Sequence, residues 1–269
     1  MKEKDIKTIW QVPKYLPYVQ PSLTDEIIEE AEKKIGYKLP KKYLELLKIQ
    51  NGGYIRFALK DTPHRQISGI GPYYPSITDF DWLSDYEDLS FDIKDLFPFD
   101  GDGHWNICLD YRKNKLNPEI TYIDTESDYE KLIAKTFNDY LNLLEIETEN
   151  EYVIETNSNI EDAIKQISET AKIEFEEPDY WAHGYPVFRS NFKDSWIWIS
   201  PNIAPSGFIR EDDERYNELK SQMETTALRY PEIPESSLLI SVSEEIVRQE
   251  LFNKLTTSGI KIRELKEYV

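Results

Sequence analysis

The fold of the first half of the chain is decided by two adjacent segments, TDEIIEEAEKKIG (residues 24–36) and LPKKYLELLKIQNGG (residues 39–53). The first segment predicts a short helix. Thr24 suits the N-cap, two acidic residues follow it, and two lysines precede the end, as the helix dipole favours. The apolar residues recur at helical spacing, and Gly36 is the residue type that most often ends a helix in the left-handed conformation.

The second segment predicts another helix, which begins near Pro40. Proline is tolerated in the first helical turn because its missing N–H would have no partner there. Tyr43 and the leucines that follow it share the inward face. The run Asn51-Gly52-Gly53 is a strong stop signal, and we expect at least one of the two glycines to adopt a positive φ.

Strands follow these helices. Residues 54–59 are a first candidate, and residues 120–123 are another. Between them, the glycine-rich turn at residues 100–103 leads into residues 104–111, where aromatic and aliphatic side chains alternate with smaller or polar ones. A closing helix, capped by Ser127 or Asp128, places apolar residues from Leu132 to Leu144 in one stripe. These pieces predict an α+β unit.

The order of these pieces resembles the SUKH superfamily, which comprises yeast cell-wall-synthesis regulators of Smi/Knr type and many bacterial toxin-immunity proteins. The resemblance spans about residues 23–144. It implies a mixed sheet with packed helices, no cofactor, no catalysis, and function by binding another protein. The positions that carry it, which we expect to be structural, are Gly36, Pro40, Tyr43, Asn51, Gly52, Gly53, Asp102, His104, Asp110 and Tyr111.

The second half predicts another α+β domain, of a family that its sequence does not indicate. Residues 145–151 hold four glutamates and predict a linker, so we expect domains at 1–146 and 152–269. The expected helices are residues 160–167, residues 215–228, and a helix that Ser243 caps and that carries Ile246, Val247, Leu251 and Leu255. The expected strands are residues 185–188, 196–199, 207–210, 238–242 and 260–262.

The composition favours a protein partner over nucleic acid. The chain has 51 acidic and 32 basic residues and a net charge of −19, a field that repels phosphates and attracts basic proteins. Alternatively, the negative charge serves only to keep the protein soluble. Its single cysteine, Cys108, excludes an intramolecular disulfide. The sequence has no apolar core of signal-peptide type and no apolar run long enough to span a bilayer, so we expect a cytoplasmic protein without membrane contact.

Motifs of catalysis and metal binding are missing from the sequence. The three histidines are far apart, and neither a phosphate-binding loop nor a nucleophile elbow is present. The turn at Asp100-Gly101-Asp102-Gly103 superficially resembles a calcium loop, but its twelfth position is Tyr111 instead of a bidentate carboxylate. We therefore expect a turn stiffened by aspartates, no metal and no cofactor.

The most acidic segment, residues 79–95, is the predicted partner-binding surface. It has seven acidic residues and one lysine, with aromatic residues interleaved. Aromatic anchors among carboxylates would suit a surface that grips a basic nuclease toxin. Alternatively, the carboxylates are simply solvated and the aromatic residues pack inward. The residues that we assign to this surface are Asp79, Asp81, Trp82, Asp85, Tyr86 and Asp88.

Three functions follow from these patterns. The first is an immunity protein of bacterial type that neutralises a cognate toxin by direct binding. The second is a regulatory interaction protein without a toxin partner, as the yeast relatives suggest. The third is an enzyme with its site in the second domain, around the aromatic run that contains His183, residues 180–185. No base or nucleophile stands beside that histidine in the sequence, so we expect this run to pack.

Overall fold

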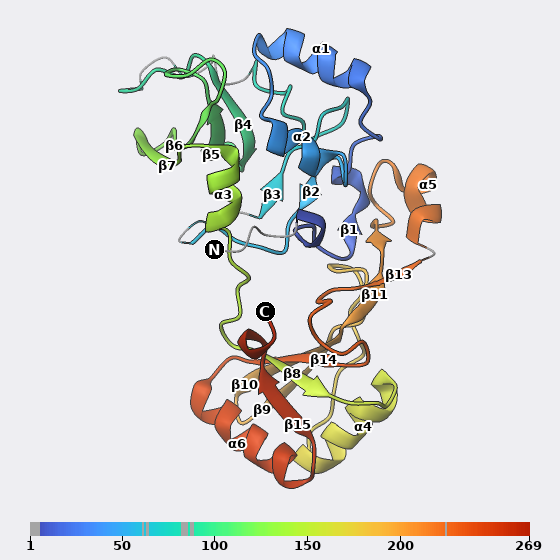
Figure 1. The fold of residues 1–269 in the computed structure, drawn as a ribbon. Coiled ribbons are helices and arrows are strands. Elements are labelled where there is room, and N and C mark those ends of the chain that lie inside the picture. Colours follow the sequence, from blue (N-terminus) through green and yellow to red (C-terminus); the bar gives the residue numbers. More distant parts are fainter. Residues whose placement is uncertain (1–5, 61, 63–64, 82–85, 87–88, 224) are drawn as a thin grey trace. The chain divides into compact units, whose positions relative to one another are not determined.

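The computed structural model describes residues 6–60, 62, 65–81, 86, 89–223 and 225–269. The chain divides into two compact units, Met1–Ile146 and Glu147–Val269, and each is described by itself. Both units combine helices with antiparallel sheets (Figure 1), so the predicted α+β class is confirmed.

The first unit contains three α-helices and seven strands among its described residues. Its helices are α1 (Asp25–Ile35), α2 (Lys41–Leu47) and α3 (Phe137–Leu143). Its strands are β1 (Lys14–Tyr15), β2 (Gly53–Tyr54), β3 (Gln66–Ile67), β4 (Leu96–Gly101), β5 (Trp105–Asp110), β6 (Glu119–Asp124) and β7 (Tyr129–Ala134). β2 pairs with β3, and β4 to β7 form a four-stranded sheet in chain order.

The caps predicted for α1 are confirmed. The Thr24 side chain accepts a hydrogen bond from the Ile27 N–H, and Gly36 ends the helix with a φ of 83°. Pro40 takes the N-cap position of α2, one residue before its first turn, and that helix ends at Leu47. The chain then turns through Gly52 and Gly53, which both have a positive φ, as the stop signal predicts.

The core of the first unit lies between these helices and one face of the four-stranded sheet. Tyr43 from α2, Phe99 from β4 and Tyr140 from α3 belong to it, and so do Ile9 and Trp10 of the N-terminal lead-in. The other face of the sheet is also covered in part, because Cys108 packs with Leu96 and Ile123 in a smaller cluster. Burial raises the pKa of the Cys108 thiol well above its usual value, as expected for an inert core cysteine.

Two predicted elements of the first unit are wrong. The helix expected over residues 127–144 is instead strand β7 followed by the shorter α3, whose N-cap is Thr136. A turn at Asp128, with a φ of 48°, returns the chain so that β7 pairs with β6, and this pairing overrides the helical spacing. The strand expected at residues 54–59 shrinks to β2 and two isolated bridges, at Ile55 and Ala58.

The second unit contains three α-helices and eight strands among its described residues. The helices are α4 (Ile160–Ala171), α5 (Tyr216–Leu219) and α6 (Glu245–Thr257). The strands are β8 (Glu151–Glu155), β9 (Phe188–Phe192), β10 (Ser195–Pro201), β11 (Ile203–Pro205), β12 (Gly207–Phe208), β13 (Thr226–Leu228), β14 (Leu238–Val242) and β15 (Lys261–Glu264). The large sheet has the order β15-β8-β14-β10-β9, and α4 and α6 cover one of its faces (Figure 1).

The predictions for the second unit hold less well at the ends of elements. β8 was not predicted, and it begins at Glu151 inside the expected linker. The expected helix over residues 215–228 is the single turn α5, a 3-10 turn and strand β13, which pairs with β11. The strand expected at residues 185–188 begins only at Phe188. Glu244, not Ser243, is the N-cap of α6, and Ile246 lies exposed.

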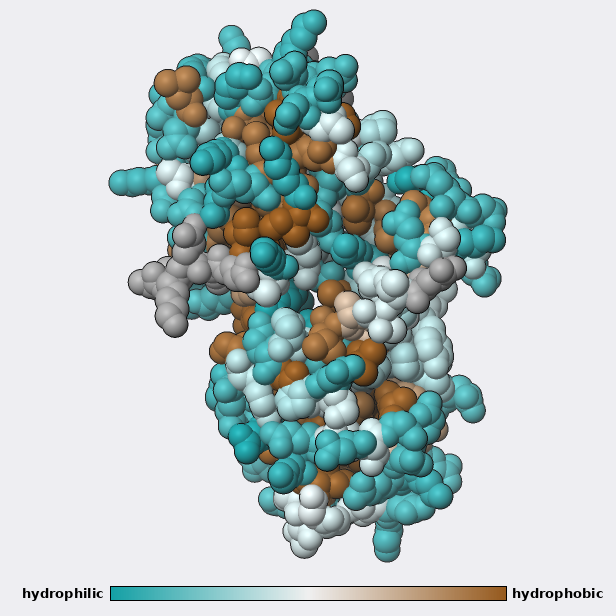
Figure 2. All heavy atoms as spheres, turned by 45° about the vertical axis from the view of Figure 1, so that its right-hand side comes forward, coloured by the Kyte–Doolittle hydropathy of each residue, from teal (hydrophilic) through white to brown (hydrophobic). Residues whose placement is uncertain are grey.

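The surface drawn in Figure 2 is mainly hydrophilic in both units, with apolar side chains visible in patches between the polar ones. Among the described residues, no helix is both long enough and apolar enough to cross a bilayer.

Candidate functional site

The family motif around Asn51 holds one wall of a cavity. Asn51 Nδ2 donates to the carbonyl of Ile70 (2.8 Å), and its Oδ1 accepts from the Ile70 N–H (2.8 Å). The Tyr43 hydroxyl donates to the carbonyl of Ser68 (2.5 Å). Gly52 lies so close to Gly69 that a Cβ added to it would be 2.5 Å from the Gly69 nitrogen. These contacts fix residues 68–70 against the end of α2.

The cavity beside this wall is acidic. Its volume is about 250 Å³, and three aspartates face it without a Lys, Arg or His among the twelve described residues that line it. We call it the acidic cavity. Its lining residues are Gln66, Ser68, Tyr74, Pro75, Ser76, Asp79, Pro98, Asp100, Gly101, Asp102, Gly103 and Asn106.

Two of its aspartates come from the end of β4 and the glycine-rich turn that follows it. Strand alternation places Phe97 and Phe99 in the core. The pairing of β4 and β5 shifts register between Pro98 and Asp100, and Asp100, 3% exposed, lines the cavity. Asp102 Oδ1 accepts hydrogen bonds from the N–H groups of His104 (2.9 Å) and Trp105 (3.1 Å). The predicted turn stiffened by an aspartate is therefore confirmed.

Tyr74 forms the aromatic rim of the acidic cavity. Its ring is 61% exposed and meets the Tyr18 ring edge-on at 5.8 Å. Desolvation of its hydroxyl, together with Tyr18 and the carboxylates of Asp79 and Asp102, raises the pKa of Tyr74. Gln20 holds the rim loop, because it donates to the carbonyls of Tyr73 and Pro75 and accepts from the Tyr73 N–H. An exposed ring beside carboxylates is suited to receive a cationic side chain.

Two described residues of the predicted partner-binding segment lie at this cavity. Asp79 lines it, and the Tyr86 hydroxyl donates to the carbonyl of Gly103 on its other side (3.4 Å). Asp81 lies exposed and forms an ion pair with Lys34 (3.3 Å). The other three assigned residues, Trp82, Asp85 and Asp88, lie outside the described residues.

Several other described residues of that segment have a structural role. The Phe80 ring meets the Phe97 ring edge-on at 4.9 Å, and Phe91 packs on the cluster around Cys108. Asp92 accepts from the Lys94 N–H, and Asp95 accepts from the Tyr37 hydroxyl (2.9 Å) and from Lys115. For these residues, inward packing and local hydrogen bonding account for the pattern.

The motif residues Asp110 and Tyr111, at the end of β5, are also structural. Arg112 donates to both carboxylate oxygens of Asp110, at 3.0 and 2.7 Å, and the Thr121 hydroxyl donates to the same group. Desolvation alone would raise the pKa of this buried carboxyl, but the hydrogen bonds outweigh it and hold the pKa of Asp110 below its usual value. The Tyr111 ring stacks on the Tyr37 ring at 4.6 Å. His104, in contrast, lies exposed, with Nδ1 2.8 Å from Glu126.

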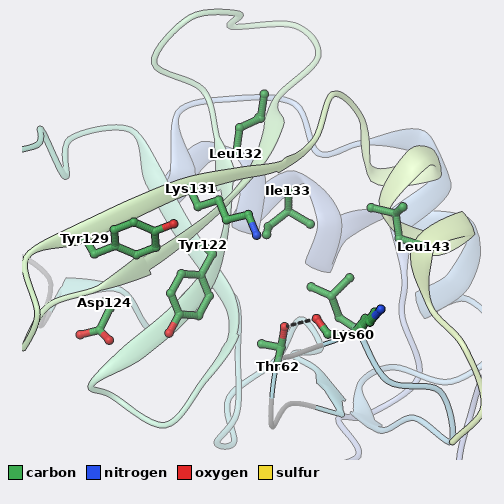
Figure 3. A pocket seen from close by; sticks show the side chains of 10 residues that line it. Lys60, Thr62, Tyr122, Asp124, Tyr129, Lys131, Leu132, Ile133 and Leu143 are labelled. Atoms are coloured by element: carbon green, nitrogen blue, oxygen red, sulfur yellow. Dashed lines mark hydrogen bonds between the residues drawn. The ribbon is translucent and has the colours of Figure 1, made fainter.

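A second hollow of about 370 Å³ lies beside β6 and β7 (Figure 3). Tyr122 and Tyr129 line it from these strands, and Lys131 points into it between Tyr122 and Ile133. Lys60 and Asp124 add one charge of each sign, and the remaining lining residues are Leu59, Thr62, Leu132, Ile133 and Leu143. With two lysines and one aspartate, this hollow lacks the uniform negative charge of the acidic cavity.

The run at residues 180–185 forms a stack of rings and cations in the second unit. The His183 ring lies parallel to the Tyr185 ring at 5.5 Å, and the Arg229 guanidinium lies over Tyr185 at 4.2 Å. Burial and the neighbouring Arg229 lower the pKa of His183. Within the described parts of the chain, no three His, Cys, Asp or Glu side chains are grouped as a metal site requires.

Sequence reasoning missed three residues of the acidic cavity as functional candidates. They are Tyr74, Asp100 and Asn106, of which Asn106 is 3% exposed. Asp100 stands in the turn motif and could have been singled out there. Tyr74 and Asn106 carry no local signal, because only the fold brings their strand and loop together.

Comparison with known proteins agrees with this reading of the first unit. Residues 22–143 match the SMI1 / KNR4 family (SUKH-1). The N-terminal unit carries a SUKH domain. The match ends before the second unit begins, so the SUKH assignment applies to the first unit alone. No curated protein matches the chain.

Proposed function

We propose that the chain is a cytoplasmic, non-catalytic binding protein whose SUKH domain holds a basic protein partner at the acidic cavity. We further propose that the partner is a cognate toxin of nuclease type, so that the chain acts as its immunity protein. The observation that carries the proposal is the acidic cavity, set in a SUKH domain by that family's own motif residues. The net charge of −19 supports it, because it would speed encounter with a basic partner.

If the partner binds at the cavity, the carboxylates of the cavity should determine its affinity more than the total charge of the chain does. We expect the double variant Asp79→Asn/Asp102→Asn to bind the proposed cognate toxin domain about tenfold more weakly, because it removes two carboxylates from the contact. The matched control is Glu161→Gln/Glu169→Gln, which removes two charges from α4 of the second unit and leaves the cavity intact. Association and dissociation rates at two ionic strengths would measure both variants.

The outcomes separate the two parts of the proposal. Equal weakening in both double variants would mean that total charge matters and that the cavity is not the contact. Failure of the wild-type chain to bind any toxin domain encoded by an adjacent gene would reject the immunity function and favour the regulatory alternative. Asparagine at residue 102 can still accept the two backbone hydrogen bonds of the turn, so the fold should survive the substitution.

A further inference from the structure

Strand β10 of the second unit presents two tryptophans on the face of the sheet that lies away from the helices. Ile197 and Ile199 point into the core that α4 and α6 complete. Trp196 and Trp198 alternate with them, so they point the opposite way, and they are 42% and 37% exposed. Their ring centroids lie 6.4 Å apart with 32° between the ring planes.

The same face of the sheet is covered elsewhere. Val153 of β8 and Leu239 of β14 lie on it, and both are buried under Ile233 and Leu265. The cover does not extend over β10, where large apolar rings remain in contact with solvent. Large exposed aromatic rings grouped on a soluble protein mark interaction sites.

Polar residues surround the two rings. Trp198 stands opposite Arg189 of β9 and Ser241 of β14, and Trp196 stands opposite Asn191. Arg189 is itself held in an ion pair with Glu176. We call the set of Arg189, Asn191, Trp196, Trp198 and Ser241 the tryptophan face. An aromatic centre within a polar rim is the usual anatomy of a protein–protein interface.

The rings of the tryptophan face differ from other rings of this unit in lacking a cation. Arg210 lies over Trp181 at 4.5 Å, Arg229 over Tyr185 at 4.2 Å, and Arg248 over Tyr152 at 5.2 Å. Among the described residues, no Lys or Arg lies over the ring of Trp196 or Trp198. Two strong cation–π acceptors are thus left open.

The charge of the second unit indicates which partner would fill them. Residues 147–269 contain 25 acidic and 13 basic residues, so the unit as a whole attracts cations. We infer that the tryptophan face is a docking surface for an arginine-bearing segment of a basic protein. Arginine is favoured over lysine because its planar guanidinium stacks on indole rings and is more weakly hydrated. The inference goes beyond the proposed function, because it concerns the other unit and requires no toxin.

A labelled hexa-arginine peptide tests the inference on the full chain, with hexa-lysine as the equal-charge comparison. Anisotropy titrations near 0.15 M salt, where the Debye length is about 8 Å, would limit unspecific attraction. We expect hexa-arginine to bind more tightly than hexa-lysine. We also expect Trp196→Leu/Trp198→Leu to weaken hexa-arginine binding by about fivefold or more, because leucine keeps apolar contact but has no ring face.

The control is Trp181→Leu, which removes an exposed tryptophan that Arg210 already covers, and it should change affinity by less than about twofold. Unchanged hexa-arginine affinity in the double leucine variant would overturn the inference. So would equal affinity for the two peptides. A wild-type dimer that becomes monomeric in the double variant, measured by sedimentation, would assign the tryptophan face to a second copy of the chain and also overturn it.

Discussion

The two units differ in where their distinctive residues lie. In the first unit, most positions that make the SUKH family recognisable are buried or cap an element: Tyr43, Asn51 and Asp110 are inside, and Gly36 ends α1. In the second unit, which lies outside the residues matched to that family, the distinctive residues are exposed tryptophans on a bare part of the sheet. The residues of a family motif can therefore serve mainly the fold, while residues outside the motif are available to bind a partner.

The comparison predicts that motif substitutions unfold the first unit, while substitutions on binding surfaces change affinity. The largest effect should come from Gly52→Ala. Residue 52 has a φ of +89°, and an added Cβ would lie 2.5 Å from a backbone nitrogen. We therefore expect the substitution to lower the free energy of unfolding by about 3 kcal/mol. Gly103→Ala is the control. The φ of Gly103 is +99°, but no atom lies within 4 Å of an added Cβ, so the free energy of unfolding should fall by only about 1 kcal/mol.

Urea denaturation of the full chain would measure the stability of both glycine variants, with hydrogen exchange in peptides from residues 22–143 as the readout. Restricting the readout to these peptides matters, because two units need not unfold together. Equal losses at Gly52 and Gly103 would show that the close approach to Gly69 adds nothing to the backbone strain.

The next effect concerns the buried pair of Asp110 and Arg112. We expect Asp110→Asn to cost about 3 kcal/mol at pH 7, because it leaves the Arg112 guanidinium without its buried carboxylate. Asp81→Asn, which changes an exposed partner of Lys34, should change stability little.

The pH dependence of the same pair has a definite sign. The pKa of Asp110 is lowered in the folded chain, so its contribution to stability is fully present above the unfolded pKa of about 3.9 and is lost as the pH falls through the folded value. The difference in unfolding free energy between wild type and Asp110→Asn should therefore shrink below about pH 4. A difference that stays constant down to pH 2 would contradict the role given to this carboxylate.

The sequence predicts elements that depend on local interactions better than elements that depend on contacts between distant residues. α1 is set by its own caps and spacing, so residues 24–36 sufficed. β7 was mistaken for helix because Leu132 and Ile133 fit a helical stripe with α3, and only pairing with β6 decides between the two. The acidic cavity needed Tyr74, Asp79 and Asn106 brought together from a loop, the acidic segment and a strand. Alternation predicted the strand at residues 196–199, but which face stays open depends on distant segments such as Ile233 and Leu265.

The smallest predicted effect compares two buried tyrosines of the first unit, one in the motif and one outside it. Tyr43 donates its hydroxyl proton to Ser68, so Tyr43→Phe leaves that buried carbonyl without its partner and should cost about 1.5 kcal/mol. The Tyr140 hydroxyl is buried with no hydrogen-bond partner among the described residues, so Tyr140→Phe should leave stability unchanged or raise it slightly. Both variants keep the ring and its packing, so the urea midpoint reports the hydroxyl alone. If Tyr140→Phe lost as much stability as Tyr43→Phe, the special position of the motif tyrosine as the anchor of the cavity wall would fail.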